Sequence, residues 1–382
     1  MCFLRFCFAV KSFAGRTKKS FAASLEQMKK IISVVLILFS TSFVFGQGTQ
    51  QKPLSQAEYV KMLYDLQKNP GKKDELVEVV RRRGIGFELT DGLRGLTTSK
   101  SRNDTELKRT LEEAARRRQN PEKSQLPTEK EAAEILKKAH EATLAAVEEM
   151  PDFTVKQLVS RGVAYAGTNN WKSIDKLTIA VNYSTTKGEN YKVLAINGAP
   201  VNAEGGSNYA GLGGATTGGE FASNLAKVFQ TESKTKFIRV DTDVLRNRKA
   251  IVYQYEIALE NYKSGVGYKG AVLEEVATGQ KGKIWIDREN FRVLRIEYKL
   301  TDIPPNFPIK ALEKTIDYDW VEIAEQKYLL PALSDARFTT TSEIGLLQDR
   351  NLIRFKNYQK YGSEVKILDD DETAPEEKKP NQ

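Results

Sequence analysis

The side chains with the most reactive chemistry are few and widely spaced in this sequence. His140 is the only histidine among 382 residues, and the two cysteines, Cys2 and Cys7, lie in the first seven positions. A Ser-His-Asp triad or a His/Cys metal centre needs several such groups close together. We therefore expect no catalytic centre, no metal and no cofactor. His140 is interpreted as a residue at the border of a helix face.

Two pairs of carboxylates have a spacing that suits chemistry. Asp317 and Asp319 lie two apart in "DYDWVEI", so on a strand both point to the same side. Such a pair can bind calcium or act as acid and base, which leaves a carboxylate-dependent hydrolase as one hypothesis. A strand with one wet face has the same pattern, and we favour this structural interpretation. The second pair, Asp287 and Glu289 in "IDREN", is predicted to lie at a hairpin turn.

A glycine-rich stretch, "NYAGLGGATTGGEF" at 208–221, resembles a phosphate-binding loop at first sight. Gly213 and Gly218 have the spacing of a P-loop, but Gly219 and Glu220 replace the lysine and hydroxyl residue that must follow. The stretch also lacks the dinucleotide pattern and a surrounding βαβ unit. We predict a mobile crossover loop that gates access to the site covered by the short helix after it, with Phe221, Leu225 and Phe229 facing inward.

The first 46 residues have the composition of a segment that is removed. A two-lysine start at Met28, an apolar run from Ile31 to Phe45 and a small Gly46 are typical of a secretory signal peptide. Residues 1–27 then reflect a misplaced start, and an N-terminal membrane anchor is the alternative interpretation. This segment carries +6 of the formal +9 charge, so +3 remains and nucleic acid is not an expected partner. We expect a periplasmic or secreted protein with no integral membrane span after cleavage.

Residues 54–118 are predicted to form a small helical module. Ser55 is the expected N-cap of a first helix, Gly84 ends a second, and Asp104 or Thr105 caps a third. "VEVVRRRGIGFELT" resembles a short module of uncharacterised exported bacterial proteins, but a polar loop is expected after it. Arg81, Arg82 and Arg83 are interpreted as a solvated helix end, with an anionic surface as the alternative. A linker at 119–127 follows.

Residues 128–367 indicate an α+β domain. A long helix carries one apolar stripe from Ala132 to Met150 and ends at Pro151. About ten strands with alternating polarity follow, for example "KLTIAVNY", "AIVYQYEIALE" and "RVLRIEYKL". The pattern predicts a curved, mostly antiparallel sheet, and the acidic tail at 368–382 is expected to be disordered.

With the segments "GKIWIDRENFRVLRIEY" and "DYDWVEIAEQKYLLP", the chain resembles the lipoprotein-localisation carrier (LolA/LolB-like) superfamily over about residues 130–367. That resemblance implies an incomplete barrel whose apolar concave face holds acyl chains under a helical lid. The apolar sides of these strands would then line the ligand site. The alternative is that they pack against the helices as a core that holds no ligand. The candidate lining residues are Ile179, Val181, Tyr183, Tyr253, Tyr255, Ile257, Leu294, Ile296, Tyr298, Phe221, Leu225 and Phe229.

These observations favour an exported, non-catalytic binding protein for a lipid, an acylated molecule or another hydrophobic ligand. Its expected partner is a lipid or a lipoprotein. The alternative is a cell-envelope scaffold whose sheet is inert and whose residues 54–118 dock a protein partner.

Overall fold

The computed structural model describes residues 52–121, 124–201, 209, 212, 215–221, 223–262, 265–269 and 273–361. The predicted signal peptide, the acidic tail and a strand predicted at 363–367 lie outside these residues. So does most of the glycine-rich stretch. The described residues from Pro53 onward belong to one compact unit.

The N-terminal part of this unit is helical and has its own apolar core. Its helices are α2 (Gln56–Lys68), α3 (Lys73–Arg83), α4 (Asp91–Lys100) and α5 (Thr105–Gln119), with a 3-10 turn at Pro70–Lys72. Ser55 and Glu58 form a capping box on α2, Gly84 ends α3 with a φ of 65°, and Asp104 caps α5. The three predicted helices are confirmed. The loop expected after α3 is wrong in part, because residues 91–100 form α4.

The remainder is a large antiparallel sheet with a long helix, α6 (Glu129–Glu148), before it, and a short helix, α7 (Ser223–Phe229), between its fourth and fifth strands. The α+β class is confirmed. The strands are β1 (Phe153–Tyr165), β2 (Lys172–Ser184), β3 (Gly188–Ile196), β4 (Ala199–Pro200), β5 (Lys236–Leu245), β6 (Arg248–Ile257), β7 (Gly265–Lys269), β8 (Leu273–Ala277), β9 (Gly279–Asp287), β10 (Val293–Thr301), β11 (Ile309–Ile323), β12 (Gln326–Ser342) and β13 (Gly345–Lys360), with 3-10 turns at Thr231–Ser233 and Leu259–Asn261.

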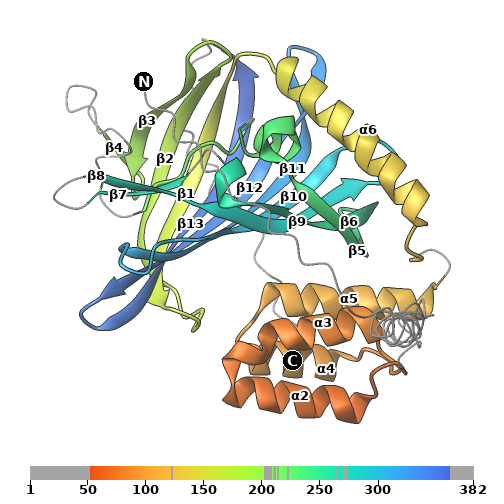
Figure 1. Cartoon of the computed structure of the whole chain (residues 1–382). Coiled ribbons are helices and arrows are strands. Elements are labelled where there is room, and N and C mark those ends of the chain that lie inside the picture. Colours follow the sequence, from red (N-terminus) through yellow and green to blue (C-terminus); the bar gives the residue numbers. More distant parts are fainter. Residues whose placement is uncertain are drawn as a thin grey trace, which may run out of the picture. The chain divides into compact units, whose positions relative to one another are not determined.

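The strands of the large sheet follow an order that differs from their order in the chain. Eleven strands follow one another as β4-β3-β2-β1-β13-β12-β11-β10-β9-β6-β5, so the sheet has two edges and is not closed into a barrel. β7 and β8 form a separate hairpin that was not predicted. Because β1 pairs with β13, the first and last long strands meet in the middle of the sheet. Figure 1 shows α6 and α7 on one side of the curved sheet.

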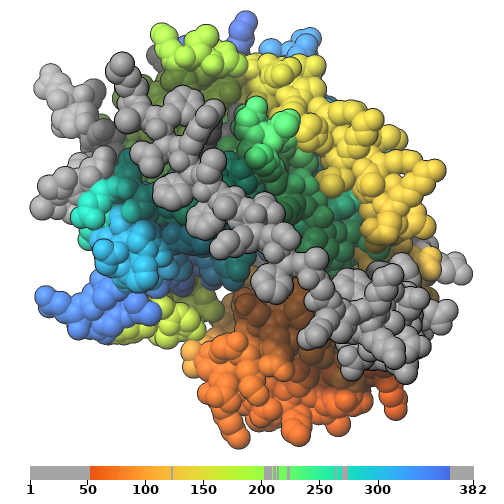
Figure 2. Space-filling view, viewed as in Figure 1, coloured from red at the N-terminus to blue at the C-terminus, as the bar shows by residue number. Residues whose placement is uncertain are grey.

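Alternation along the strands separates an apolar face from a polar one. On β9, Ile284 and Ile286 belong to the core beneath α6, whereas Trp285 belongs to a separate small cluster. We call the side beneath α6 and α7 the apolar face and the opposite side the polar face. The cover is defined as α6, α7 and residues 215–221. In the space-filling view α6 and α7 lie side by side (Figure 2).

Candidate ligand-binding face and polar cleft

The apolar face carries two separate clusters beneath the cover. One contains Ile284, Ile296 and Ile316 of the sheet with Ala132, Ile135 and Ala139 of α6. The other contains Phe153, Val155 and Ile353 with Met150 at the end of α6. The helix α6 thus contributes to one cluster directly, and the residue two positions past its end contributes to the other.

The structure brings eleven of the twelve predicted lining residues to this face. The first cluster holds Tyr253, Tyr255, Ile257, Ile296, Tyr298, Leu225 and Phe229; the second holds Ile179, Val181, Phe221 and, half-buried, Tyr183. Leu294 instead packs with Trp285 on the polar face. The pairing of β10 with β9 shifts between Val293 and Arg295, and such a bulge reverses the side to which the next residues point. The expected placement of Leu294 is therefore wrong.

The cover is held on the apolar face by a few specific contacts. The Tyr253 hydroxyl donates to the Ala132 carbonyl of α6 at 2.8 Å. Phe221 lies edge-on to Phe153, with ring centroids 5.1 Å apart, and to Phe355 at 5.6 Å. Asn351 of β13 donates from Nδ2 to the Ala215 carbonyl at 2.8 Å. The cover thus contacts the sheet through apolar packing, hydrogen bonds and ion pairs, among them Glu129 with Arg239 at 2.6 Å and Glu131 with Arg288 at 3.0 Å.

A charged pair lies at the boundary between the cover and the apolar face. The Lys314 ammonium of β11 is 2.7 Å from a carboxylate oxygen of Glu220, and the two side chains are 4% and 0% exposed. Lys314 also donates to the Gly218 carbonyl at 3.2 Å. The lysine comes from the sheet and the carboxylate from the cover. Among the described residues, this is the ion pair that joins residues 215–221 of the cover to β11.

Further buried polar groups lie among the residues of the sheet. Among the described residues, the Ser334 and Tyr318 hydroxyls and both amide atoms of Gln157 are buried without a hydrogen-bond partner. Burial raises the pKa of Tyr298 and of Tyr318 well above the usual value, and the nearby Glu220 charge acts in the same direction. Burial also raises the pKa of Glu189, which accepts from the Gly219 amide at 2.9 Å. Polar groups without partners cost free energy in an apolar site.

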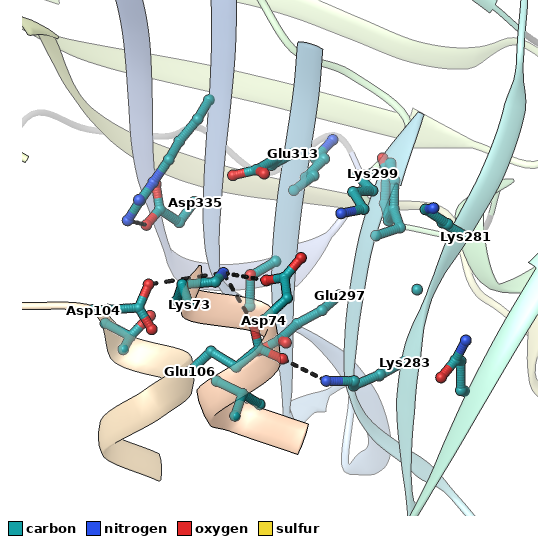
Figure 3. Close-up of a pocket in the computed structure, with 18 of the residues that line it drawn as sticks. Lys73, Asp74, Asp104, Glu106, Lys281, Lys283, Glu297, Lys299, Glu313 and Asp335 are labelled. Carbon is teal, nitrogen blue, oxygen red and sulfur yellow. Dashed lines mark hydrogen bonds and ion pairs between the residues drawn. The ribbon is translucent and has the colours of Figure 1, made fainter. Parts of the chain in front are cut away.

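The polar face forms a cleft of about 360 Å³ between the sheet and the starts of α3 and α5. Its walls are joined by ion pairs: Glu106 of α5 contacts Lys283 of β9 and, at 3.2 Å, Lys73 of α3 (Figure 3). Burial alone would raise the pKa of Glu106, but Lys283 and Lys73 lower it to about 2. This cleft suits a hydrophilic ligand or segment and not an acyl chain.

Two lysines at the outer side of the cleft have no acidic partner within ion-pair distance among the described residues. Lys281 and Lys299 are register partners on β9 and β10, so their like charges are directly opposite. Glu313 is the register partner of Lys299 on β11, but it forms no ion pair with that lysine. Figure 3 shows these three side chains in the upper part of the cleft.

Arginines of the helical segment attach it to the polar face. Arg81 Nε is 3.0 Å from Asp241, Arg109 Nη1 is 2.7 Å from Glu297, and Arg116 Nη2 is 2.7 Å from Asp243. Arg117 also contacts Asp241. Arg81 is buried, whereas Arg82 is exposed. The interpretation of Arg81–Arg83 as a solvated helix end is therefore wrong for Arg81.

The residues considered for chemistry have structural partners. Asp317 is buried and paired with Arg295 at 2.8 Å and Arg246 at 3.2 Å, while Asp319 is exposed. The pairing of β11 shifts between Asp317 and Tyr318, so the two carboxylates do not act as a pair. Asp287 caps the β9–β10 turn by accepting from the Glu289 amide at 2.8 Å.

His140 packs edge-on against Phe229, with the ring centroids 5.9 Å apart. Within the described residues, no three His, Cys, Asp or Glu side chains are grouped so as to hold a metal ion. Among the described helices we find none whose length and apolar content would allow it to span a bilayer.

Sequence reasoning missed the Glu220–Lys314 pair. The sequence singles out Glu220 only for its place after the glycine-rich stretch and at the start of the predicted short helix, and it does not single out Lys314. The available signal was Lys314 itself, because "KALEKTIDYDW" places a lysine on the side of β11 that continues with Ile316 and Tyr318.

Comparison with solved structures finds similar proteins at low sequence identity. A LolA superfamily protein from Nitrosomonas europaea is similar at 11% identity, with a TM-score of 0.29, over 61% of this chain and 94% of that one. A DUF1329 family protein from Desulfovibrio piger is similar at 8% identity, with a TM-score of 0.28, over 60% and 95%. The Pseudomonas aeruginosa MucA/MucB complex contains a chain with 8% identity and a TM-score of 0.17, over 57% and 93%.

No protein-family model and no curated protein matches the sequence. Ligand and partner have to be inferred from this chain's own residues.

Proposed function

We propose that this chain is an exported, non-catalytic binding protein for a lipid, an acylated molecule or another hydrophobic ligand. The ligand would lie between the apolar face and the cover. One observation carries the proposal: charged and hydrogen-bonding groups occupy the boundary where the cover meets the sheet. The eleven lining residues on that face then belong to a core that separates when ligand enters.

The energetics of a buried ion pair support this. Transfer of two charges from water into an apolar interior costs several kcal/mol per ion, and an apolar pair of similar volume is often as stable or more stable. A core that never opens has no physical need for Glu220 and Lys314, which are 0% and 4% exposed. If the cover separates from the sheet, these two groups are exposed to water. Charged groups at this boundary then favour the open form, because water solvates them well.

The apolar face is also large enough for a useful affinity. Each buried methylene contributes about 0.8 kcal/mol, so ten methylenes contribute about 8 kcal/mol before the cost of association is subtracted. The three isoleucines Ile284, Ile296 and Ile316 lie on adjacent strands and are each 0% exposed. An acyl chain would take the place of residues of the cover in the cluster that contains this row.

The test is binding of an environment-sensitive acyl probe to the full mature chain. We expect saturable fluorescence enhancement that unlabelled hexadecanol displaces. The control variant Lys137→Ala changes an exposed residue of α6 and should bind equally well. Absence of saturable binding by any alkyl probe would contradict the proposal.

The alternative function, an envelope interaction protein, is favoured by the polar cleft. Lys281, Lys299 and Glu313 line it without forming ion pairs with one another, and residues 54–118 supply its other wall. A polar segment of a protein partner would fit these groups. Amine-reactive cross-linking in the native compartment tests this: the Lys281→Ala/Lys299→Ala variant should lose a partner that Lys137→Ala retains. An unchanged cross-linking pattern would count against it.

A further inference from the structure

Lys314 is placed in the middle of the apolar face by the register of the sheet. Across the strands, Lys314 is opposite Tyr298 on β10 and Ala336 on β12. One pleat away on its own strand is Ile316, which is fully buried in the first apolar cluster. The row of cross-strand neighbours continues from Ala336 through Asn351 to Arg161. Arg161 forms its own ion pair with Asp175, at 2.6 Å.

The carboxylate that neutralises Lys314 belongs to the cover and not to the sheet. Glu220 is followed directly by Phe221, which inserts between Phe153 and Phe355. Glu189 is the other carboxylate of this region, and it is occupied by Tyr191 and the Gly219 amide. If the cover separates from the sheet, Lys314 keeps its place on the strand and loses its partner.

Unsatisfied hydrogen-bonding groups lie beside this lysine. Ser334 is register partner of Ile316, so it is a diagonal neighbour of Lys314 on the next strand, and its hydroxyl is buried with no described partner. Tyr318 lies on the same strand beyond Ile316, and its hydroxyl is likewise buried and unpartnered. Two hydroxyls that can donate thus lie on the same face as Lys314, and that of Ser334 comes from a diagonal neighbour on the next strand.

We propose that Lys314 is the head-group site for a single-chain amphiphile with a carboxylate, a fatty-acid-type ligand, and that Glu220 occupies this site when no ligand is bound. The inference rests on the proposed function and names its ligand class. The ligand carboxylate takes the place of the Glu220 carboxylate, so the charge of Lys314 stays balanced. The alkyl chain then lies along the isoleucine row formed by Ile316, Ile296 and Ile284.

This arrangement selects by charge. An alcohol or a quaternary ammonium of the same length gains the same apolar contacts but leaves Lys314 unpaired once Glu220 is displaced. A hydrogen bond to a charged group contributes enough to change affinity by at least about tenfold. The carboxylate should therefore be preferred over the uncharged and the cationic amphiphile.

The experiment measures displacement of the acyl probe from the full mature chain by hexadecanoate, hexadecanol and hexadecyltrimethylammonium below their micellar concentrations at pH 8. We expect hexadecanoate to bind about tenfold more tightly than hexadecanol. Lys314→Met should remove that preference, because the alcohol then leaves no lysine unpaired, while Lys314→Arg should retain it. Glu220→Gln should strengthen hexadecanoate binding, because the competing carboxylate is gone.

The outcomes separate the two proposals. If hexadecanol and hexadecanoate bind equally, and Lys314→Met affects neither, the head-group site is refuted and the hydrophobic binding function stands. If no alkyl compound binds, both are refuted. Should Lys314→Met fail to fold, Glu220→Gln decides alone: weaker or unchanged hexadecanoate binding would overturn the inference.

Discussion

At the scale of single residues, the Glu220–Lys314 pair is the feature that an inert core does not explain. A buried pair that loses one partner leaves an uncompensated charge, which typically costs 3–5 kcal/mol. Surface pairs contribute far less, with a median of about 0–1 kcal/mol. The chain offers both kinds for comparison, since Lys137 and Glu141 are 78% and 63% exposed.

We predict that Glu220→Gln lowers the free energy of unfolding of the ligand-free protein by about 3 kcal/mol. The double variant Glu220→Gln/Lys314→Met should recover to within about 1 kcal/mol of the unchanged protein, because no buried charge remains. Urea unfolding measures both. Glu141→Gln serves as the control and should change stability by less than about 0.5 kcal/mol. A Glu220→Gln variant as stable as the control would contradict the prediction.

Glu106 gives a pH dependence with a definite sign. Its pKa is lowered from 4.5 to about 2 in the folded protein, so its stabilising effect is complete above pH 4.5 and is lost as pH falls towards 2. The difference corresponds to at most about 3 kcal/mol. Glu106→Gln lacks this titration. We predict that the difference in free energy of unfolding between the unchanged protein and Glu106→Gln, measured by urea unfolding, decreases steadily from pH 5 to pH 3. A constant difference would exclude a lowered pKa of Glu106.

At the scale of elements, the periodic segments could be predicted and the irregular ones could not. The apolar stripe from Ala132 to Met150 predicts α6 closely, since its bounds are Glu129–Glu148; the structure adds Thr128 as its N-cap. The alternating runs likewise predict the faces of β2 and β6. Leu294 was misplaced because a bulge leaves no trace in an alternation of polar and apolar residues.

Helix α4 shows why local propensity failed. "DGLRGLTTSK" has two glycines and two adjacent threonines, all poor helix formers. In the structure Thr90 caps the helix, and Leu93 and Thr97 are buried against α2. Tertiary packing therefore overrides propensity. The candidate site was predictable only in its apolar part, because the partner of Lys314 is 94 positions away in the chain.

Thr97 provides a test of that packing with a matched control. Its hydroxyl donates to the Leu93 carbonyl at 2.7 Å and is 2.8 Å from the Tyr59 hydroxyl, all buried. We predict that Thr97→Val costs about 1–2 kcal/mol, because the buried Tyr59 hydroxyl loses its partner. Thr98→Val removes a similar bond to the Arg94 carbonyl at the surface and should cost less than about 0.5 kcal/mol. Equal losses in thermal or urea unfolding would contradict the account of α4.

At the scale of the whole described unit, ion pairs join the helical segment to the sheet. Arg81, Arg109 and Arg116 each contact an acidic residue of the sheet within 3.0 Å. Trp285 donates from Nε1 to Asp243 at 2.9 Å, and Arg109 lies over its ring at 4.7 Å. These contacts indicate that the segment unfolds together with the sheet.

We predict a single cooperative unfolding transition, detected alike by tryptophan fluorescence and by helical circular dichroism. Arg81→Ala should destabilise it by about 2–3 kcal/mol, since Asp241 is buried and, among the described residues, keeps Arg117 as its remaining ion-pair partner. The neighbouring Arg82→Ala changes an exposed side chain and should have almost no effect. Two separate transitions, or equal effects of the two substitutions, would show that the helical segment is independent of the sheet.

The most direct test of the central claim is native mass spectrometry of the full protein purified from its own compartment, followed by solvent extraction. We predict added mass that extracts as an acyl-chain compound with a carboxylate, and whose occupancy falls in Lys314→Met. A bare polypeptide mass, in protein that also fails to take up hexadecanoate, would contradict a ligand-binding role for the apolar face.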